Sequence, residues 1–148
     1  MNQNAFIESQ SRNIYFNQKI FFDNLGNLNN SNLFNDHFGF INILNYNQIY
    51  KIINSSEFNK IWFSSKEKID ICKDCEFRYM CQDERIPSFR NNNEWYHKTD
   101  CNYNPYLAKW QGEQGYKTLT ECGVISNENG FSIDHEKITE INKELWGE

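Results

Sequence analysis

Hydrophobic residues in the N-terminal part of the chain fall into short groups separated by polar turns. Residues 1–12 are polar and show no sustained period, so we expect a flexible N-terminus. Aromatic and β-branched side chains then gather at 14–16 and 19–23, and a turn follows at 24–27. This pattern predicts short strands joined by tight turns, with Gly26 at a positive φ.

Two segments in the middle of the chain have hydrophobic residues at the helical spacing i, i+3, i+4. These residues are Ile49, Ile52 and Ile53 in the first segment and Phe58, Ile61 and Trp62 in the second. The polar residues 54–56 between the segments offer an N-cap for the second helix. We interpret both hydrophobic stripes as core faces.

Three further elements are predicted from local signals. Residues 38–41 predict a short strand or a surface apolar turn, and 124–126 and 131–133 predict a hairpin around a turn at 127–130. Asp134 is the expected N-cap of a terminal helix. One face of that helix carries Ile138, Ile141 and Leu145. These elements together predict an α+β fold of short β-hairpins, short helices and a C-terminal helix.

Length and composition set the class of protein. The 148 residues fit one domain, which we place at 13–148, with a C-terminal β-turn and helix at 119–148. The formal net charge of −5 excludes a basic field for nucleic acid, and no apolar run is long enough to cross a membrane. The N-terminus has no export signal, so we expect a cytoplasmic protein.

The strongest chemical signal is a group of four cysteines in a loop predicted at 66–112. They are Cys72, Cys75, Cys81 and Cys101. A CxxC turn points two thiolates at one centre, and the later cysteines can complete a tetrahedral set. Two disulfides, in any of three pairings, or a redox dithiol are the alternatives. The lack of an export signal and of a surrounding βαβ pattern favours a metal.

Four thiolates suit either a 4Fe-4S cluster or zinc, because both accept soft tetrahedral sulfur. Such a site has no open coordination position, which favours a structural or electron-relay role over hydrolysis. The fifth cysteine, Cys122, lies outside any ligand motif and is interpreted as a free thiol.

Residues near the four cysteines have candidate supporting roles. Cations that could offset thiolate charge, or simply face solvent, are Lys73, Arg78 and Arg85. Aromatic residues expected to shield the metal from water are Phe77, Tyr79 and Trp95. His97 is an alternative ligand in place of Cys101, while His37 and His135 are expected to be solvated.

These features resemble the SPASM domain, the auxiliary-cluster module of radical S-adenosylmethionine (radical SAM) enzymes that modify ribosomal peptides. The shared features are the run 38–41, two short helices with Trp62, and the spacing Cys72-x2-Cys75-x5-Cys81. The amino-acid sequences of 72–79 and 101–106 resemble most closely those of the SPASM proteins in grasp-with-spasm peptide-maturation systems. The resemblance covers roughly residues 13–112.

The SPASM pattern has seven cysteines that hold two clusters, and this chain departs from it. With Gly26 as the matching glycine, three of the seven positions fall at Tyr15, Ser31 and Arg85, none of which is cysteine. The other four match Cys72, Cys75, Cys81 and Cys101. The resemblance therefore implies one complete ligand set, for a 4Fe-4S cluster with zinc as the alternative, and the loss of the other set.

The chain contains no CxxxCxxC motif for the cluster that cleaves S-adenosylmethionine, so we do not expect catalysis by this polypeptide alone. The resemblance implies an accessory protein of ribosomal peptide (RiPP) maturation, with a precursor peptide or an ATP-grasp ligase as partner. An electron-relay component for a separate radical SAM enzyme and a zinc-binding structural or regulatory module are the alternatives.

Overall fold

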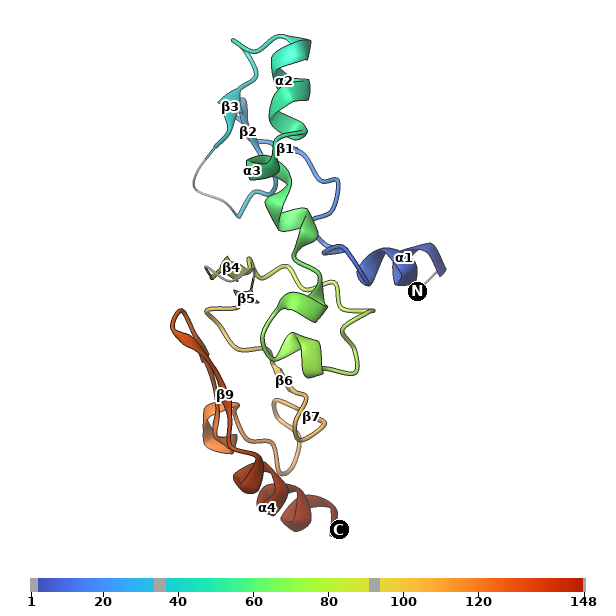
Figure 1. The fold of residues 1–148 in the computed structure, drawn as a ribbon, viewed down its shortest axis with the longest axis vertical. Coiled ribbons are helices and arrows are strands. Elements are labelled where there is room, and N and C mark those ends of the chain that lie inside the picture. The colour runs from blue at the N-terminus through green and yellow to red at the C-terminus, as the bar shows by residue number, and fades with distance from the viewer. Residues whose placement is uncertain (1–2, 34–36, 91–93, 148) are drawn as a thin grey trace. The chain divides into compact units, whose positions relative to one another are not determined.

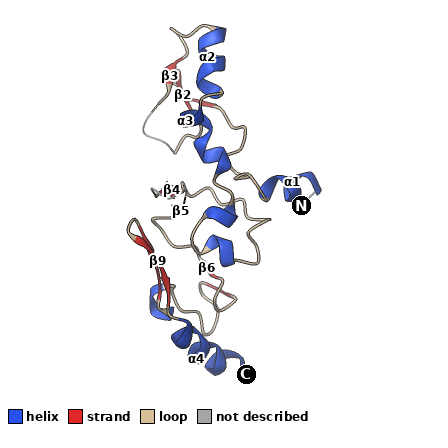
Figure 2. Ribbon diagram, in the orientation of Figure 1, coloured by secondary structure: helices blue, strands red, loops and turns tan. Residues whose placement is uncertain are grey.

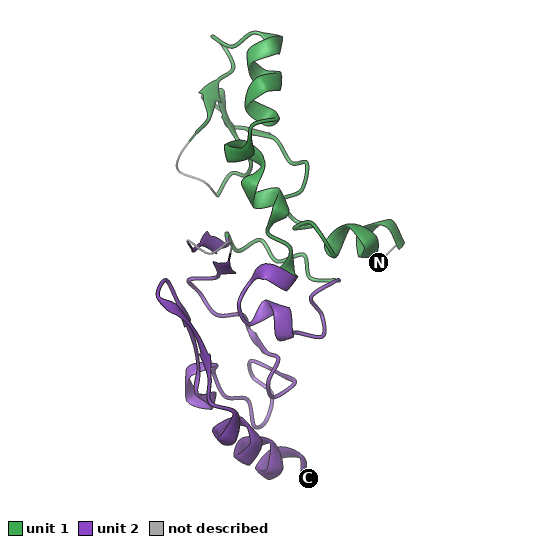
Figure 3. Ribbon diagram, in the orientation of Figure 1, with its two compact units in different colours: residues 1–66, 80–86 green, residues 67–79, 87–148 purple. Residues whose placement is uncertain are grey.

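The computed structural model describes residues 3–33, 37–90 and 94–147, and its chain forms two compact units (Figure 3). The first unit comprises 1–66 and 80–86, and the second comprises 67–79 and 87–148. Short helices and antiparallel strand pairs occur in both (Figures 1 and 2), which confirms the predicted α+β class. The single domain at 13–148 stays a prediction.

The first unit combines a small sheet with short helices. Its elements are α1 (Gln3–Ser9), β1 (Phe21–Phe22), β2 (Asn27–Asn29), β3 (Gly39–Phe40), α2 (Tyr46–Ile53), α3 (Ser56–Asn59) and the 3-10 helix η1 (Lys60–Phe63). The strands form an antiparallel sheet in the order β1-β2-β3. Gly26 has the expected positive φ, at 86°.

Polar side chains cap the helices of the first unit, and close contacts join these helices to its sheet. Asn45 and Gln48 form a capping box at the start of α2, and the Ser55 side chain caps α3, as the polar break predicts. A Cβ at Gly39 would lie 2.6 Å from Cδ1 of Leu44, so β3 lies close to the segment directly before α2. The Phe38 and Phe58 rings pack with centroids 4.8 Å apart.

The second unit is built from three hairpins, short 3-10 helices and a terminal helix. Its elements are η2 (Lys66–Lys68), which begins at the unit boundary, η3 (Cys72–Asp74), β4 (Ser88–Phe89), β5 (Trp95–Tyr96), β6 (Tyr103–Asn104), β7 (Lys109–Trp110), η4 (Thr120–Cys122), β8 (Val124–Asn127), β9 (Gly130–Ile133) and α4 (His135–Trp146). The pairs are β4-β5, β6-β7 and β8-β9. The hairpin of β8 and β9 and the cap of α4 by Asp134 confirm the predictions made for this end of the chain.

The hydrophobic core of the second unit lies between α4, β8 and the loop before β7. Its buried residues are Leu107, Leu119, Cys122, Val124 and Ile141. Ile71, which directly precedes the CxxC pair, packs against this core. The core therefore anchors the start of the cysteine loop.

Two local predictions differ from the structure. Residues 14–16 form a turn and not a strand, because the Asn13 side chain accepts a hydrogen bond from the Tyr15 N–H at 3.1 Å. The polar N-terminus, where no regular element was predicted, contains α1. Among the described residues, no helix is long and apolar enough to span a membrane.

Candidate metal centre

The CxxC pair occupies one tight turn in the second unit. Cys72 begins η3, and the backbone N–H of Cys75 donates to the Cys72 carbonyl oxygen at 3.1 Å. Both side chains are half-buried. The turn therefore places two accessible thiols on one short segment, as metal-binding CxxC motifs require.

A strained backbone conformation precedes this turn. Ile71 has φ 68° and ψ −47°, and the Cys72 N–H donates to the Asp70 carbonyl oxygen at 2.7 Å across it. This is a γ-turn with positive φ, a rare conformation that is especially unfavourable for a β-branched residue. Such strain persists only where the surroundings hold it, and it is concentrated at functional sites.

Buried polar contacts hold the chain immediately before the strained turn. The Asp70 carboxylate forms an ion pair with Arg90 and accepts a hydrogen bond from Ser126 Oγ at 3.0 Å. The Asp70 N–H donates to the Trp95 carbonyl oxygen at 2.9 Å. Arg90 also donates to the Gly130 carbonyl oxygen at 2.9 Å, so one guanidinium joins the cysteine loop to the β8-β9 hairpin.

Two tyrosine hydroxyls form hydrogen bonds with carboxylates of the cysteine loop. The Tyr106 hydroxyl donates to Asp74 Oδ2 at 2.7 Å, and the Tyr103 hydroxyl donates to the Glu76 carboxylate. Burial and the bond to Glu76 raise the pKa of Tyr103, so this phenol remains a donor. The Phe77 and Tyr103 rings also pack, with centroids 5.1 Å apart.

These contacts join the segments that carry three of the four predicted ligands. Tyr103 begins β6 only two residues after Cys101, and it contacts the residues next to Cys75. Cys72, Cys75 and Cys101 therefore belong to segments that contact each other within the second unit.

Cys81 lies in the first unit, in the irregular segment 80–86. Two residues later, Asp83 accepts a hydrogen bond from Lys66 Nζ at 2.8 Å and from Arg85 Nη2 at 2.7 Å. Burial opposes ionisation of Asp83, but the Arg85 and Lys66 bonds outweigh it and lower the pKa of the carboxyl group. Arg85, a candidate for offsetting thiolate charge, is thus ion-paired with Asp83.

The other predicted supporting residues have defined contacts. Arg78 Nη1 donates to the Cys75 carbonyl oxygen at 3.1 Å, so this cation supports the CxxC turn. Lys73 Nζ is 3.8 Å from Asp70 and 4.8 Å from the Phe131 ring centroid. Trp95 is buried in β5, whereas Phe77 is exposed and Tyr79 donates to Glu67.

Cys122 belongs to the core and not to the cysteine loop. It is fully buried, and it accepts a hydrogen bond from Asn104 Nδ2 at 3.3 Å. Burial raises the pKa of its thiol, although the Asn104 bond opposes this shift. Cys122 forms no disulfide, and its assignment as a thiol outside the metal site stays a prediction.

The chemistry of the cysteine loop fits a soft metal, but the full ligand set is not assembled. All five cysteines lie within the described residues, and none forms a disulfide. Within 3–33, 37–90 and 94–147, no three His, Cys, Asp or Glu side chains are gathered as a metal ion would require. The four-thiolate site at 72, 75, 81 and 101 therefore stays a prediction, as does the choice between 4Fe-4S and zinc.

No family model, curated protein or solved structure matches the chain. The resemblance to SPASM proteins therefore depends on the residues themselves.

Sequence reasoning missed the residues that fix the cysteine loop. These are Asp70, Arg90, Tyr103 and Tyr106. Their partners lie 20 to 32 residues away in the chain, so no local pattern marks them. The spacing of Tyr103 and Tyr106 just after Cys101 is the one signal that could have placed them near the site.

Proposed function

We propose that this chain is a metal-binding accessory protein of the SPASM type that acts in the maturation of ribosomal peptides. Its partners on this proposal are a precursor peptide or an ATP-grasp ligase. The observation that supports it is the strained γ-turn at Ile71, directly before the CxxC turn. An ion pair from Asp70 to Arg90 holds this loop, and hydrogen bonds from Tyr103 and Tyr106 join it to the segment that follows Cys101. Backbone strain of this kind is concentrated at functional sites.

On this proposal Cys72, Cys75, Cys81 and Cys101 supply four thiolates to one metal centre. A 4Fe-4S cluster, or zinc as the alternative, is stable in such a set because both prefer soft sulfur ligands. A closed set of four thiolates stabilises the fold and leaves no position for substrate. The role of the metal is therefore to stabilise the fold or to relay electrons, and partner binding occurs on the protein surface.

The proposal is tested by anaerobic purification followed by metal analysis, absorption spectroscopy and binding measurements. We expect about one metal centre per chain, and specific binding of the metal-loaded protein to a precursor peptide or to its ATP-grasp ligase by biolayer interferometry. Protein stripped of metal by a chelator should bind neither partner, because metal binding and folding are coupled.

Each outcome of this experiment has a defined meaning. If metal analysis finds zinc and not iron in the purified protein, the accessory role is retained and the electron-relay alternative is excluded. Folded, metal-loaded protein that binds neither a precursor peptide nor the ligase would contradict the proposal.

A further inference from the structure

A surface groove of about 530 Å³ runs along one side of α4, within the second unit. Its lining includes Thr139, Asn142, Lys143 and Trp146, which share one stripe of the helix. This volume lies in the range of ordinary ligand sites. The groove is distinct from the cysteine loop, since none of the four cysteines lines it.

Helix α4 has three stripes of different chemistry. Ile138, Ile141 and Leu145 pack on the core, and the carboxylates Glu136, Glu140 and Glu144 follow each other at a spacing of four along an exposed stripe. The groove residues form the third stripe, which contains no carboxylate. The groove stripe itself therefore has no carboxylate, and Glu140, three residues before Lys143, is a neighbour across the stripe boundary.

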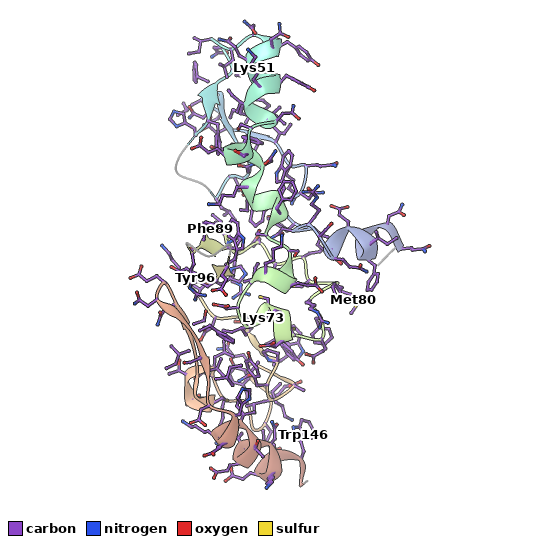
Figure 4. All side chains as sticks on the ribbon, in the orientation of Figure 1. Lys51, Lys73, Met80, Phe89, Tyr96 and Trp146 are labelled. Carbon is purple, nitrogen blue, oxygen red and sulfur yellow. The ribbon has the colours of Figure 1, made fainter. Side chains whose placement is uncertain are left out.

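The hairpin of β6 and β7 contacts this third stripe. Asn142 Nδ2 donates to the Tyr106 carbonyl oxygen at 3.0 Å, and Lys109 Nζ lies 4.3 Å from the centroid of the Trp146 ring. These contacts link the groove stripe to the β6-β7 hairpin. Trp146, labelled in Figure 4 near the end of α4, is still 53% exposed, so part of its ring is open to a ligand.

The groove is rich in hydrogen-bond donors. In its lining, Lys143 carries an ammonium group, Trp146 has an indole N–H, and Asn142 retains a second amide N–H beyond the one given to Tyr106. A second ammonium group, that of Lys109, lies beside the lining, 4.3 Å from the centroid of the Trp146 ring. The hydroxyl of Thr139 already donates to the His135 carbonyl oxygen at 2.8 Å, which turns its methyl group into an apolar wall. An acceptor-only group such as a carboxylate is the natural complement of this donor set.

Charge supports the same ligand class. Among the described residues, neither Lys143 nor Lys109 forms an ion pair with a carboxylate. Lys143 partly offsets the negative end of the helix dipole, and Lys109 supplies the second positive charge. In a chain of net charge −5, these two ammonium groups lie beside an exposed aromatic ring.

We propose that this groove binds an acidic, partly apolar peptide segment through its side-chain carboxylates. The lysines and donor N–H groups receive the carboxylates, and the Trp146 ring receives an apolar side chain. The inference rests on the proposed function only in taking a peptide as the occupant. On this inference, the groove is the surface that recognises such a peptide.

The test is a ¹⁵N NMR titration of the metal-loaded full chain with a defined probe. The probe is an acetylated and amidated tetrapeptide of two glutamates and two leucines, and the control replaces both glutamates with glutamines. We expect the acidic probe to shift amide signals of 106–110 and 139–146 and the Trp146 indole signal. The glutamine peptide should bind at least about fivefold more weakly.

Variants locate the interaction on the helix. Lys143→Gln should weaken binding of the acidic probe about two- to fivefold, and Trp146→Ala about tenfold, whereas Trp146→Phe should retain most of it. The matched control is Lys137→Gln, which removes the same charge from another stripe of α4 and should leave binding unchanged. The amide spectrum of each variant reports that it is folded.

Equal binding of the two peptides would overturn the inference, as would equal weakening by Lys137→Gln and Lys143→Gln or shifts confined to other parts of the chain. The metal content of the same samples separates this inference from the proposed function. If metal-loaded protein does not bind the acidic probe, the inference about the groove is contradicted and the proposed function is not. If folded protein without metal binds the probe, the metal-binding function is contradicted and the inference about the groove is not.

Discussion

The interior of the first unit is mainly polar, whereas that of the second unit is mainly hydrophobic. Among the described residues, the buried apolar side chains of the first unit are Phe16, Leu28, Phe58 and Ile61. Its buried polar residues are Ser9, Asn13, Asn29, Asn30, Ser31, Ser64, Ser65 and Lys66. Of the residues that the structure describes in the second unit, Asp70 and Asn104 alone are buried and polar. The buried apolar residues there are Ile69, Trp95, Tyr96, Tyr103, Leu107, Leu119, Cys122, Val124 and Ile141.

This difference indicates which forces hold each unit. In the first unit, directional bonds such as that from Asn30 Nδ2 to the Phe58 carbonyl oxygen, at 2.8 Å, satisfy buried polar groups. In the second unit, non-directional packing of apolar side chains is the main source of stability. The cysteine loop is attached to the unit that has its own hydrophobic core, which explains how its strained turn is maintained.

The largest loss of stability is expected at the buried ion pair between Asp70 and Arg90 in the otherwise hydrophobic second unit. Arg90→Met leaves the buried Asp70 carboxylate without its main partner and should lower the free energy of unfolding by about 3–5 kcal/mol. Lys66→Met in the first unit should cost less, because Arg85 still pairs with Asp83. Denaturant unfolding measures both, and equal losses would contradict this account of the two ion pairs.

Truncation in the core of the second unit should cost nearly as much. Leu107 is 1% exposed, so Leu107→Ala removes buried methyl groups and leaves a cavity, at about 2–5 kcal/mol. The matched control is Leu25→Ala, at a 66% exposed position, with an expected change within about 0.5 kcal/mol. A loss below 1 kcal/mol for Leu107→Ala would show that this core is not the main source of stability.

A polar substitution tests the first unit in the same way. Asn30→Ala leaves the buried Phe58 carbonyl oxygen without its donor, and we expect the free energy of unfolding to fall by about 1–3 kcal/mol. Asn47→Ala, on the exposed surface of α2, is the control and should have little effect. If both variants were neutral, the buried amides of this unit would be dispensable.

The smallest stability effect is expected at the tyrosine contact of the cysteine loop. Tyr106→Phe removes the hydrogen bond to Asp74, which is near the surface, and should cost about 0.5–1.5 kcal/mol. Hydrogen exchange should show faster opening at 72–78 and unchanged protection in α4. Faster exchange throughout the second unit would instead make Tyr106 a general core residue.

The sequence predicted those elements whose signals are local. Asp134 and the spacing of Ile138, Ile141 and Leu145 predicted α4, and the polar residues at 127–130 predicted the hairpin of β8 and β9. Each of these depends on residues within four positions of each other. Local patterns of this kind can be recognised without knowledge of the tertiary structure.

The remaining elements depend on partners far along the chain. The two-residue strands β4 and β6 are too short to show a period, and their pairing is set by the turns and contacts around them. For the candidate site, the spacing predicted that Cys72 and Cys75 share one turn. It did not predict the γ-turn at Ile71, which is imposed by contacts on both sides.

The central claim, that positions 72, 75, 81 and 101 bind one metal centre, is tested most directly by metal stoichiometry across matched cysteine variants. Wild-type protein and Cys122→Ala, both purified anaerobically, should contain about one centre per chain by elemental analysis. Cys72→Ala and Cys81→Ala should lose it, because a missing thiolate opens the site. Metal content that is absent in the folded wild type, or equal in all four proteins, would contradict the claim.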